Sequence, residues 1–270
     1  MPFTVSHIVA ALPLNNKLGK YSKYTALSPL IIGSMTPDIA YITPFLVHQR
    51  MDSHSLIGLY LFCIPMGLTI YFLYHLLMAP VVVSFFPEKI KRLLHPDLFI
   101  GKLPSISSHV LIISLVLGAI THIIWDFFTH ESGIPQYLTW MNTPLLTIDG
   151  YELMSFRVLQ HLSSIIGLGI LIFIIFRWYK MAIPLSKDQA YWKVSKRLKL
   201  FSLITLITVS IIAGCINGYA SLPDNNVLYG VYNLQVFVKY ALVAAMGAIL
   251  FTCIGLGLLY QISIRRKKQF

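Results

Sequence analysis

Five long runs of apolar residues divide this chain, and they restrict its fold more than any other feature of the sequence. Each run has about 20 residues or more, the length that an α-helix needs to cross the hydrocarbon core of a bilayer. Backbone polar groups in lipid must be hydrogen bonded within the protein, so the runs predict helices. They occupy residues 56–78, 107–128, 158–178, 200–219 and 236–262.

The composition agrees with a membrane protein. Hydrophobic residues make up 56% of the chain and charged residues only 11%. We therefore expect an all-α polytopic membrane protein with about five transmembrane helices and short N-terminal helices. It would form a single membrane domain over 1–270, made of short helices and loops in 1–55, transmembrane helices in 56–262 and a basic tail in 263–270.

The net charge of +11 does not predict a nucleic-acid partner. Lys and Arg cluster between the apolar runs and in the tail, where membrane topology places them. The lipid bilayer is therefore the expected partner. The positive-inside rule puts the basic segments, residues 79–106, 177–199 and the tail, in the cytoplasm of a multi-pass protein of the inner (plasma) membrane.

The side on which residues 1–55 lie is open at this stage. Five spans place this segment on the outer face, but Lys17, Lys20 and Lys23 argue against that location. A sixth, broken span at 27–47 would put the N-terminus inside and is the main alternative.

The second apolar run ends in a group of residues suited to metal binding. His122, Asp126 and His130 are spaced i, i+4, i+8, so they share one side of a helix. The two histidines would lie about 12 Å apart along the axis, whereas a metal–ligand bond is about 2.0–2.2 Å long. Either the helix unwinds before His130, or two ions bind with Asp126 between or near them.

Other candidate ligands lie near the same predicted membrane face. His7 is expected in the first turn of a short helix capped by Thr4 or Ser6, and Asp38 in a loop that follows a short, proline-broken helix. His54 would begin the first span with Ser53 as its N-cap, and His161 begins the third. Imidazole and carboxylate ligands together suit zinc, with manganese or iron as alternatives.

These motifs also carry a resemblance. Pro-Phe-Thr-x-Ser-His7, Gly33-Ser-x-x-Pro-Asp38, His54-Ser55, His122-x-x-x-Asp126-x-x-Thr-His130 and Gln160-His161 resemble an uncharacterised bacterial integral-membrane family, a domain of unknown function. Their order is also distantly similar to predicted membrane-bound metal-dependent hydrolases and to the zinc-dependent phospholipase C group. That likeness implies hydrolysis of a phosphoester or lipid. The later HxxxE ligand pair of the phospholipases has no clear counterpart here.

Two functions follow as hypotheses. The first is a metal-dependent hydrolase acting on a phosphoester or lipid-linked substrate at the outer membrane face. A divalent ion would lower the pKa of a bound water there, and Asp126 or Asp38 would bridge ions or act as general base. The alternative is a non-catalytic protein, a scaffold or a metal or proton transporter, in which the His/Asp cluster is structural or conducting.

Overall fold

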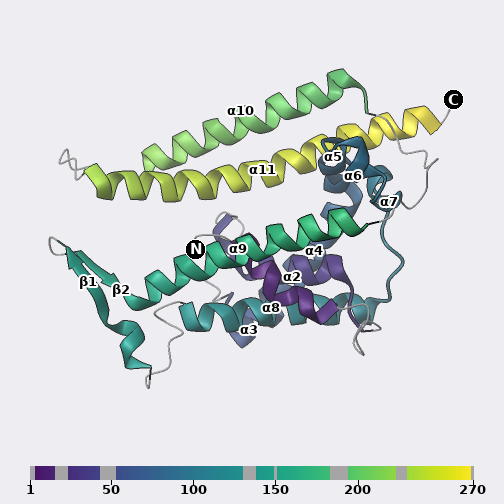
Figure 1. Ribbon diagram of the computed structural model, residues 1–270. Helices are drawn as coiled ribbons and strands as arrows, with labels where there is room; N and C mark the ends of the chain where they lie inside the picture. Colours follow the sequence, from purple (N-terminus) through teal and green to yellow (C-terminus); the bar gives the residue numbers. More distant parts are fainter. Residues whose placement is uncertain are drawn as a thin grey trace. The chain divides into compact units, whose positions relative to one another are not determined.

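The computed structural model describes residues 4–15, 24–42, 53–129, 138–148, 151–182, 194–222 and 230–268. These residues form helices and one two-stranded sheet (Figure 1). Among them, five helical segments are long and apolar enough to cross a membrane. The predicted fold class is therefore confirmed. The segments are Leu56–Ser84, Ser108–Thr129, Ser155–Met181, Lys196–Ala220 and Asn233–Arg265.

The first candidate span is a mixed helix. Two π-helical turns interrupt its α-helical hydrogen bonding, and each such turn rotates the side-chain face that follows it. Its parts are α3 (Leu56–Gly58), the π turn η4 (Leu59–Cys63), α4 (Ile64–Leu73), the π turn η5 (Tyr74–Met78) and α5 (Ala79–Ser84).

The chain divides into two compact units. One comprises residues 1–40, 47–71 and 105–182, and the other comprises 41–46, 72–104 and 183–270. The single membrane domain expected from the sequence is not tested by this division and stays a prediction.

The second unit is built on a long helical pair. Helices α10 (Lys196–Ala220) and α11 (Gly230–Lys268) pack along each other. The Tyr260 side chain of α11 is buried, and its hydroxyl lies 3.1 Å from that of Ser84 and 3.4 Å from that of Ser202. The unit also contains η5, α5 and two short helices, α6 (Glu88–Lys91) and α7 (Asp97–Ile100).

The first unit carries the candidate ligands. Its described helical elements are the 3-10 turn η1 (Thr4–His7), α1 (Ile8–Ala11), the 3-10 turn η2 (Leu12–Asn15), most of α2 (Leu27–Ile42), α8 (Ser108–Thr129), the 3-10 turn η6 (Thr139–Asn142) and α9 (Ser155–Met181), together with α3, η4 and most of α4. We expected Thr4 or Ser6 to cap a short helix. Instead His7 occupies the N-cap position of α1, and no side chain caps it.

A second expectation, that Asp38 lies in a loop, was wrong. Asp38 lies inside the 16-residue helix α2. Pro29 occupies the first turn, where helical N–H groups have no intrahelical partner in any case. Pro37 removes one interior hydrogen bond, and packing against α8 keeps the segment helical.

Helices α2 and α8 run parallel in a fixed register. The Ala26 N–H donates to Ser114 Oγ, and His122 Nδ1 lies 2.7 Å from the Ser34 carbonyl oxygen, so both contacts join residues 88 positions apart. Glycines let the two backbones approach. A Cβ on Gly118 would collide with the Leu30 carbonyl oxygen and the Ser34 nitrogen.

A small two-stranded sheet lies in the sequence between α8 and α9. Strand β1 (Pro144–Ile148) pairs antiparallel with β2 (Tyr151–Met154). The sequence signal that we missed is the Asp149-Gly150 dipeptide between two short apolar stretches, which is typical of hairpins.

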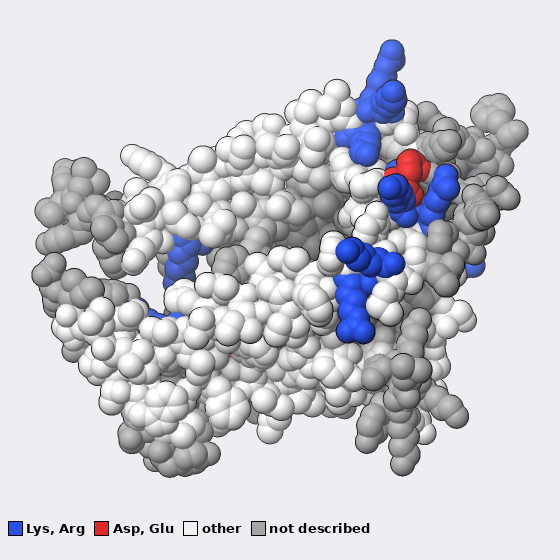
Figure 2. Space-filling view, in the orientation of Figure 1, with Lys and Arg blue, Asp and Glu red and all other residues white. Residues whose placement is uncertain are grey.

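The surface is largely uncharged along the long helices. Figure 2 shows Lys and Arg near helix ends, with broad white surface between them. Exposed Ile, Leu and Phe side chains are numerous on the candidate spans, including Ile165, Ile172 and Phe173 on α9. An apolar exterior of this extent is that of a protein whose sides face lipid.

The close approach of α2 and α8 yields a first prediction. Gly118→Ala should destabilise the protein by about 1–3 kcal/mol, because the added methyl group meets backbone atoms that cannot move aside easily. Gly169→Ala in α9 is the matched control, because a Cβ there meets nothing within 4 Å. Thermal unfolding in detergent measures both variants. Equal midpoints for the two would contradict the tight packing.

Candidate metal centre

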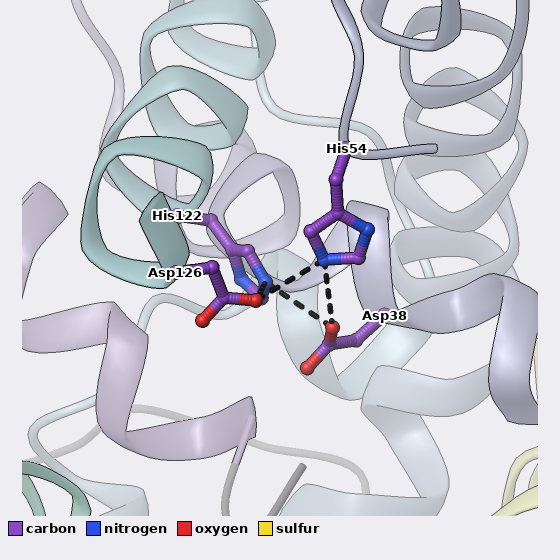
Figure 3. Close-up of side chains that lie close together, drawn as sticks. All are labelled: Asp38, His54, His122 and Asp126. Carbon is purple, nitrogen blue, oxygen red and sulfur yellow. Dashed lines mark ion pairs between the residues drawn. The ribbon is translucent and has the colours of Figure 1, made fainter. Parts of the chain in front are cut away.

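Four side chains from separate parts of the first unit point toward one another (Figure 3). Asp38, His54, His122 and Asp126 each offer one ligand atom, and these atoms all lie within 4.8 Å of one another. The sequence analysis named all four as candidate ligands, and the structure brings them together. They form a cluster of possible metal ligands.

The four ligand atoms close a ring in which imidazoles and carboxylates alternate. His122 Nε2 lies 3.1 Å from Asp38 Oδ1 and 3.2 Å from Asp126 Oδ2. His54 Nε2 lies 3.2 Å from the same Asp126 oxygen and 3.5 Å from the same Asp38 oxygen. Two ligands of a tetrahedral zinc ion with bonds of about 2.0–2.1 Å are about 3.3 Å apart, so these four separations suit such an ion.

Local structure positions each donor. His122 and Asp126 follow each other by one turn on the continuous helix α8, so one helix face supplies both. His54 lies just before α3, because Ser55 and not Ser53 is the N-cap, accepting from the Gly58 N–H. Our expectation of Ser53 as the cap was wrong. Ser53 instead donates to the Pro37 carbonyl oxygen.

Hydrogen bonds on the far side of each imidazole fix its orientation. His122 Nδ1 lies 2.7 Å from the Ser34 carbonyl oxygen, so this nitrogen carries the proton and Nε2 faces the carboxylates. His54 Nδ1 lies 3.1 Å from Ser53 Oγ, whose own proton goes to Pro37. Imidazoles that ligate metals are commonly oriented in this way, with one nitrogen hydrogen bonded and the other free to bind.

Two buried atoms of the ring have no hydrogen-bond partner among the described residues. They are Asp38 Oδ1 and His122 Nε2, which lie close together without hydrogen-bond geometry. Leaving such atoms unsatisfied in a buried site is costly. A cation between them would satisfy both, and a divalent cation would also neutralise the two carboxylates. The residues therefore fit a metal ion.

The second oxygen of each carboxylate contacts a residue outside the ring. Thr4 Oγ1 donates to Asp38 Oδ2 at 2.6 Å. His7 Nε2 lies 3.5 Å from Asp126 Oδ1, and the His7 ring stacks on that of His122 with centroids 4.0 Å apart. Trp125 meets the His7 ring edge-on at 5.7 Å. In this structure His7 contacts Asp126 outside the ring, and its role as a metal ligand stays a prediction.

Access to the cluster differs among its members. The side chains of Asp38 and His122 are 1% and 0% exposed, whereas that of His54 is 23% exposed.

Burial alone would lower the pKa of His54, but Asp126 and Asp38 outweigh it and raise the pKa to about 9. His54 is thus protonated at neutral pH in the metal-free protein, and it would release that proton on binding an ion.

One further candidate, His161, is not part of this group, and the structure does not describe another, His130. His161 lies on an exposed part of α9. His130 lies outside the described residues, which follow α8 only as far as Thr129. Both stay predictions as ligands. The sequence analysis missed the contacts of Thr4, Ser34 and Ser53, because hydroxyl and carbonyl partners of a ligand have no spacing signature.

The Thr4 contact yields a second prediction. Thr4→Val keeps the side-chain shape but leaves Asp38 Oδ2 buried without this donor, so stability should fall by about 1–3 kcal/mol. Thr69→Val is the control, because Thr69 is exposed and its hydroxyl bonds only the Pro65 carbonyl oxygen of its own helix. Unfolding of the metal-free protein measures both. A loss no greater than that of Thr69→Val would show that the hydrogen bond contributes nothing.

Comparisons with known proteins identify the family and nothing more specific. No curated protein and no solved structure matches the chain, so no named relative supports the likeness to hydrolases. One family matches residues 1–262, which is nearly the whole length. The chain therefore belongs to the family described as Domain of unknown function (DUF4184).

Proposed function

We propose that this protein is a membrane-bound metal-dependent hydrolase that acts on a phosphoester or lipid-linked substrate at the outer face of a bacterial inner membrane. The observation that supports this best is the ring of two imidazoles and two carboxylates at 3.1–3.5 Å, with an unsatisfied oxygen and nitrogen facing each other. Two histidines with two carboxylates suit zinc, manganese or iron.

Each residue then has a defined task. Asp38, His54, His122 and Asp126 would hold one ion, and Ser34 and Ser53 orient the two imidazoles through their Nδ1 atoms. Such an ion would lower the pKa of a bound water and would act as a Lewis acid toward the substrate. The His7–Asp126 contact lies beside the ring and offers a place where a proton can be taken up.

The position of the cluster supports a substrate at the membrane surface. His54 precedes the first candidate span by two residues, and Asp126 lies in the last turn of the second. Both therefore lie at span ends and not at mid-bilayer. His54 is also the most exposed of the four donors, so a substrate would approach from its side. Close to it, Leu56 and Ile57 are exposed apolar residues that suit contact with acyl chains.

The burial of the donors favours a second candidate function. Four protein ligands fill a tetrahedral zinc shell completely, and closed shells are typical of structural sites. The same cluster could therefore hold a structural ion in a non-catalytic membrane protein. The number of protein ligands on the ion distinguishes the catalytic from the structural function, because a catalytic ion keeps a position for water.

Metal content gives the third prediction. Protein purified without chelators should carry about one divalent ion per chain, and Asp126→Ala or His122→Ala should lose most of it because each removes a donor from the ring. His109→Ala is the matched control, since His109 lies exposed near the start of the same helix. Elemental analysis provides the measurement. Wild-type protein that takes up no zinc, manganese or iron would refute a metal site.

Hydrolysis gives the fourth prediction. Metal-loaded protein should cleave a phosphodiester or phospholipid in mixed micelles, and Asp38→Asn should reduce turnover by at least about 100-fold, as expected for an altered ligand. His109→Ala should keep full activity. X-ray absorption on the same samples counts the ligands. A stoichiometric ion with four protein ligands and no turnover would support the structural role and contradict the hydrolase.

A further inference from the structure

We propose that residues 4–15 and 24–42 are the two legs of a helical hairpin that enters the membrane from the side of the His/Asp cluster, with Leu14 and Thr25 toward the opposite, basic face. The inference does not depend on the proposed function. It rests on contacts within the first unit that fix how the two legs run beside helix α8.

The two legs are antiparallel. At one end Thr4 Oγ1 donates to Asp38 Oδ2, and at the other Thr25 Oγ1 donates to the Leu14 carbonyl oxygen. The first leg packs against both α8 and α9. Its Ser6 is fully buried beside Gly167, which lies near the middle of α9. The first leg therefore packs on two candidate spans, and at its cluster end His7 contacts Asp126 in the last turn of α8.

The second leg fixes how far the hairpin penetrates. It runs parallel to α8, from the Ala26–Ser114 contact to the cluster that contains Asp38 and Asp126. That distance is 12 residues on each helix, about 18 Å of axial rise. Ser114 lies six residues after the start of α8, so the far end of the hairpin comes within about 9 Å of the level where α8 begins.

Each leg is too short to be recognised as a span by itself. A transmembrane helix needs about 20 apolar residues, whereas α2 has 16 and its sequence contains two prolines and an aspartate. The apolar pattern alone therefore leaves open whether this segment enters the bilayer. Packing within the protein stabilises this short helix, because Leu30, Ser34 and Thr36 are completely buried within the first unit.

Charge supports the direction of insertion. The sequence that joins the legs carries Lys17, Lys20 and Lys23, which are costly at mid-bilayer but stable at a water interface. Helix α8 begins six residues after Lys102, at the end of the basic segment 79–106. The hairpin directs Leu14 and Thr25, which flank these lysines in the sequence, toward the end of the first unit where α8 begins. This removes the conflict with the positive-inside rule that five spans alone create.

Cysteine accessibility in sealed membrane vesicles tests the hairpin. Tyr24→Cys reports on its turn, because Tyr24 is exposed. Lys102→Cys marks the basic face and Trp140→Cys, also exposed, marks the face of the cluster. The parent chain, whose three native cysteines lie in apolar helices, gives the background. A membrane-impermeant maleimide is added to right-side-out and to inside-out vesicles.

Tyr24→Cys should react from the same side as Lys102→Cys and be protected from the side of Trp140→Cys. Reaction from the Trp140 side overturns the proposal, and so does reaction only after detergent is added. Trypsin on vesicles of the unmodified chain is a second measurement that needs no substitution. Cleavage after Lys17, Lys20 or Lys23 from the Lys102 side supports the hairpin, and cleavage from the other side refutes it.

Discussion

The first unit depends on the burial of two carboxylates. Asp38 and Asp126 lie among apolar helices, where an ionised side chain is stable only if opposite charge and hydrogen bonds surround it. His54 and His122 face both carboxylates, and Thr4 and His7 contact their outer oxygens. The segments that supply these partners are far apart in the sequence. The cluster therefore holds the unit together as well as offering a site for an ion.

The helices around the cluster are shaped by close backbone contact more than by large side chains. Gly33 and Gly118 allow α2 and α8 to touch, and Gly167 does the same for the first leg and α9. Small residues at helix contacts are common in membrane proteins, because lipid is as apolar as leucine and gives little drive for helix association. This close backbone contact determines which residues of α8 lie opposite Asp38, and therefore the geometry of the ring.

The sequence predicted the helical spans well, because apolar runs of sufficient length leave few other structures in a bilayer. It also predicted His122 and Asp126 on one helix face, since the spacing of four residues is a property of the helix itself. It misplaced Asp38, because the rule that proline breaks helices does not account for tertiary packing, which keeps Pro37 inside α2. The hydroxyl and carbonyl partners of the ligands were not predictable, because those groups occur throughout any chain.

The constant offset of 88 positions between α2 and α8 has a consequence for how this family can change in evolution. Deleting or inserting one residue between Ala26 and Asp38 would turn the aspartate by about 100° and shift it by about 1.5 Å along the helix. No side-chain rotamer restores that displacement. Length variation should therefore be confined to connecting segments, while homologues keep the number of residues in α2 and in the facing stretch of α8 unchanged.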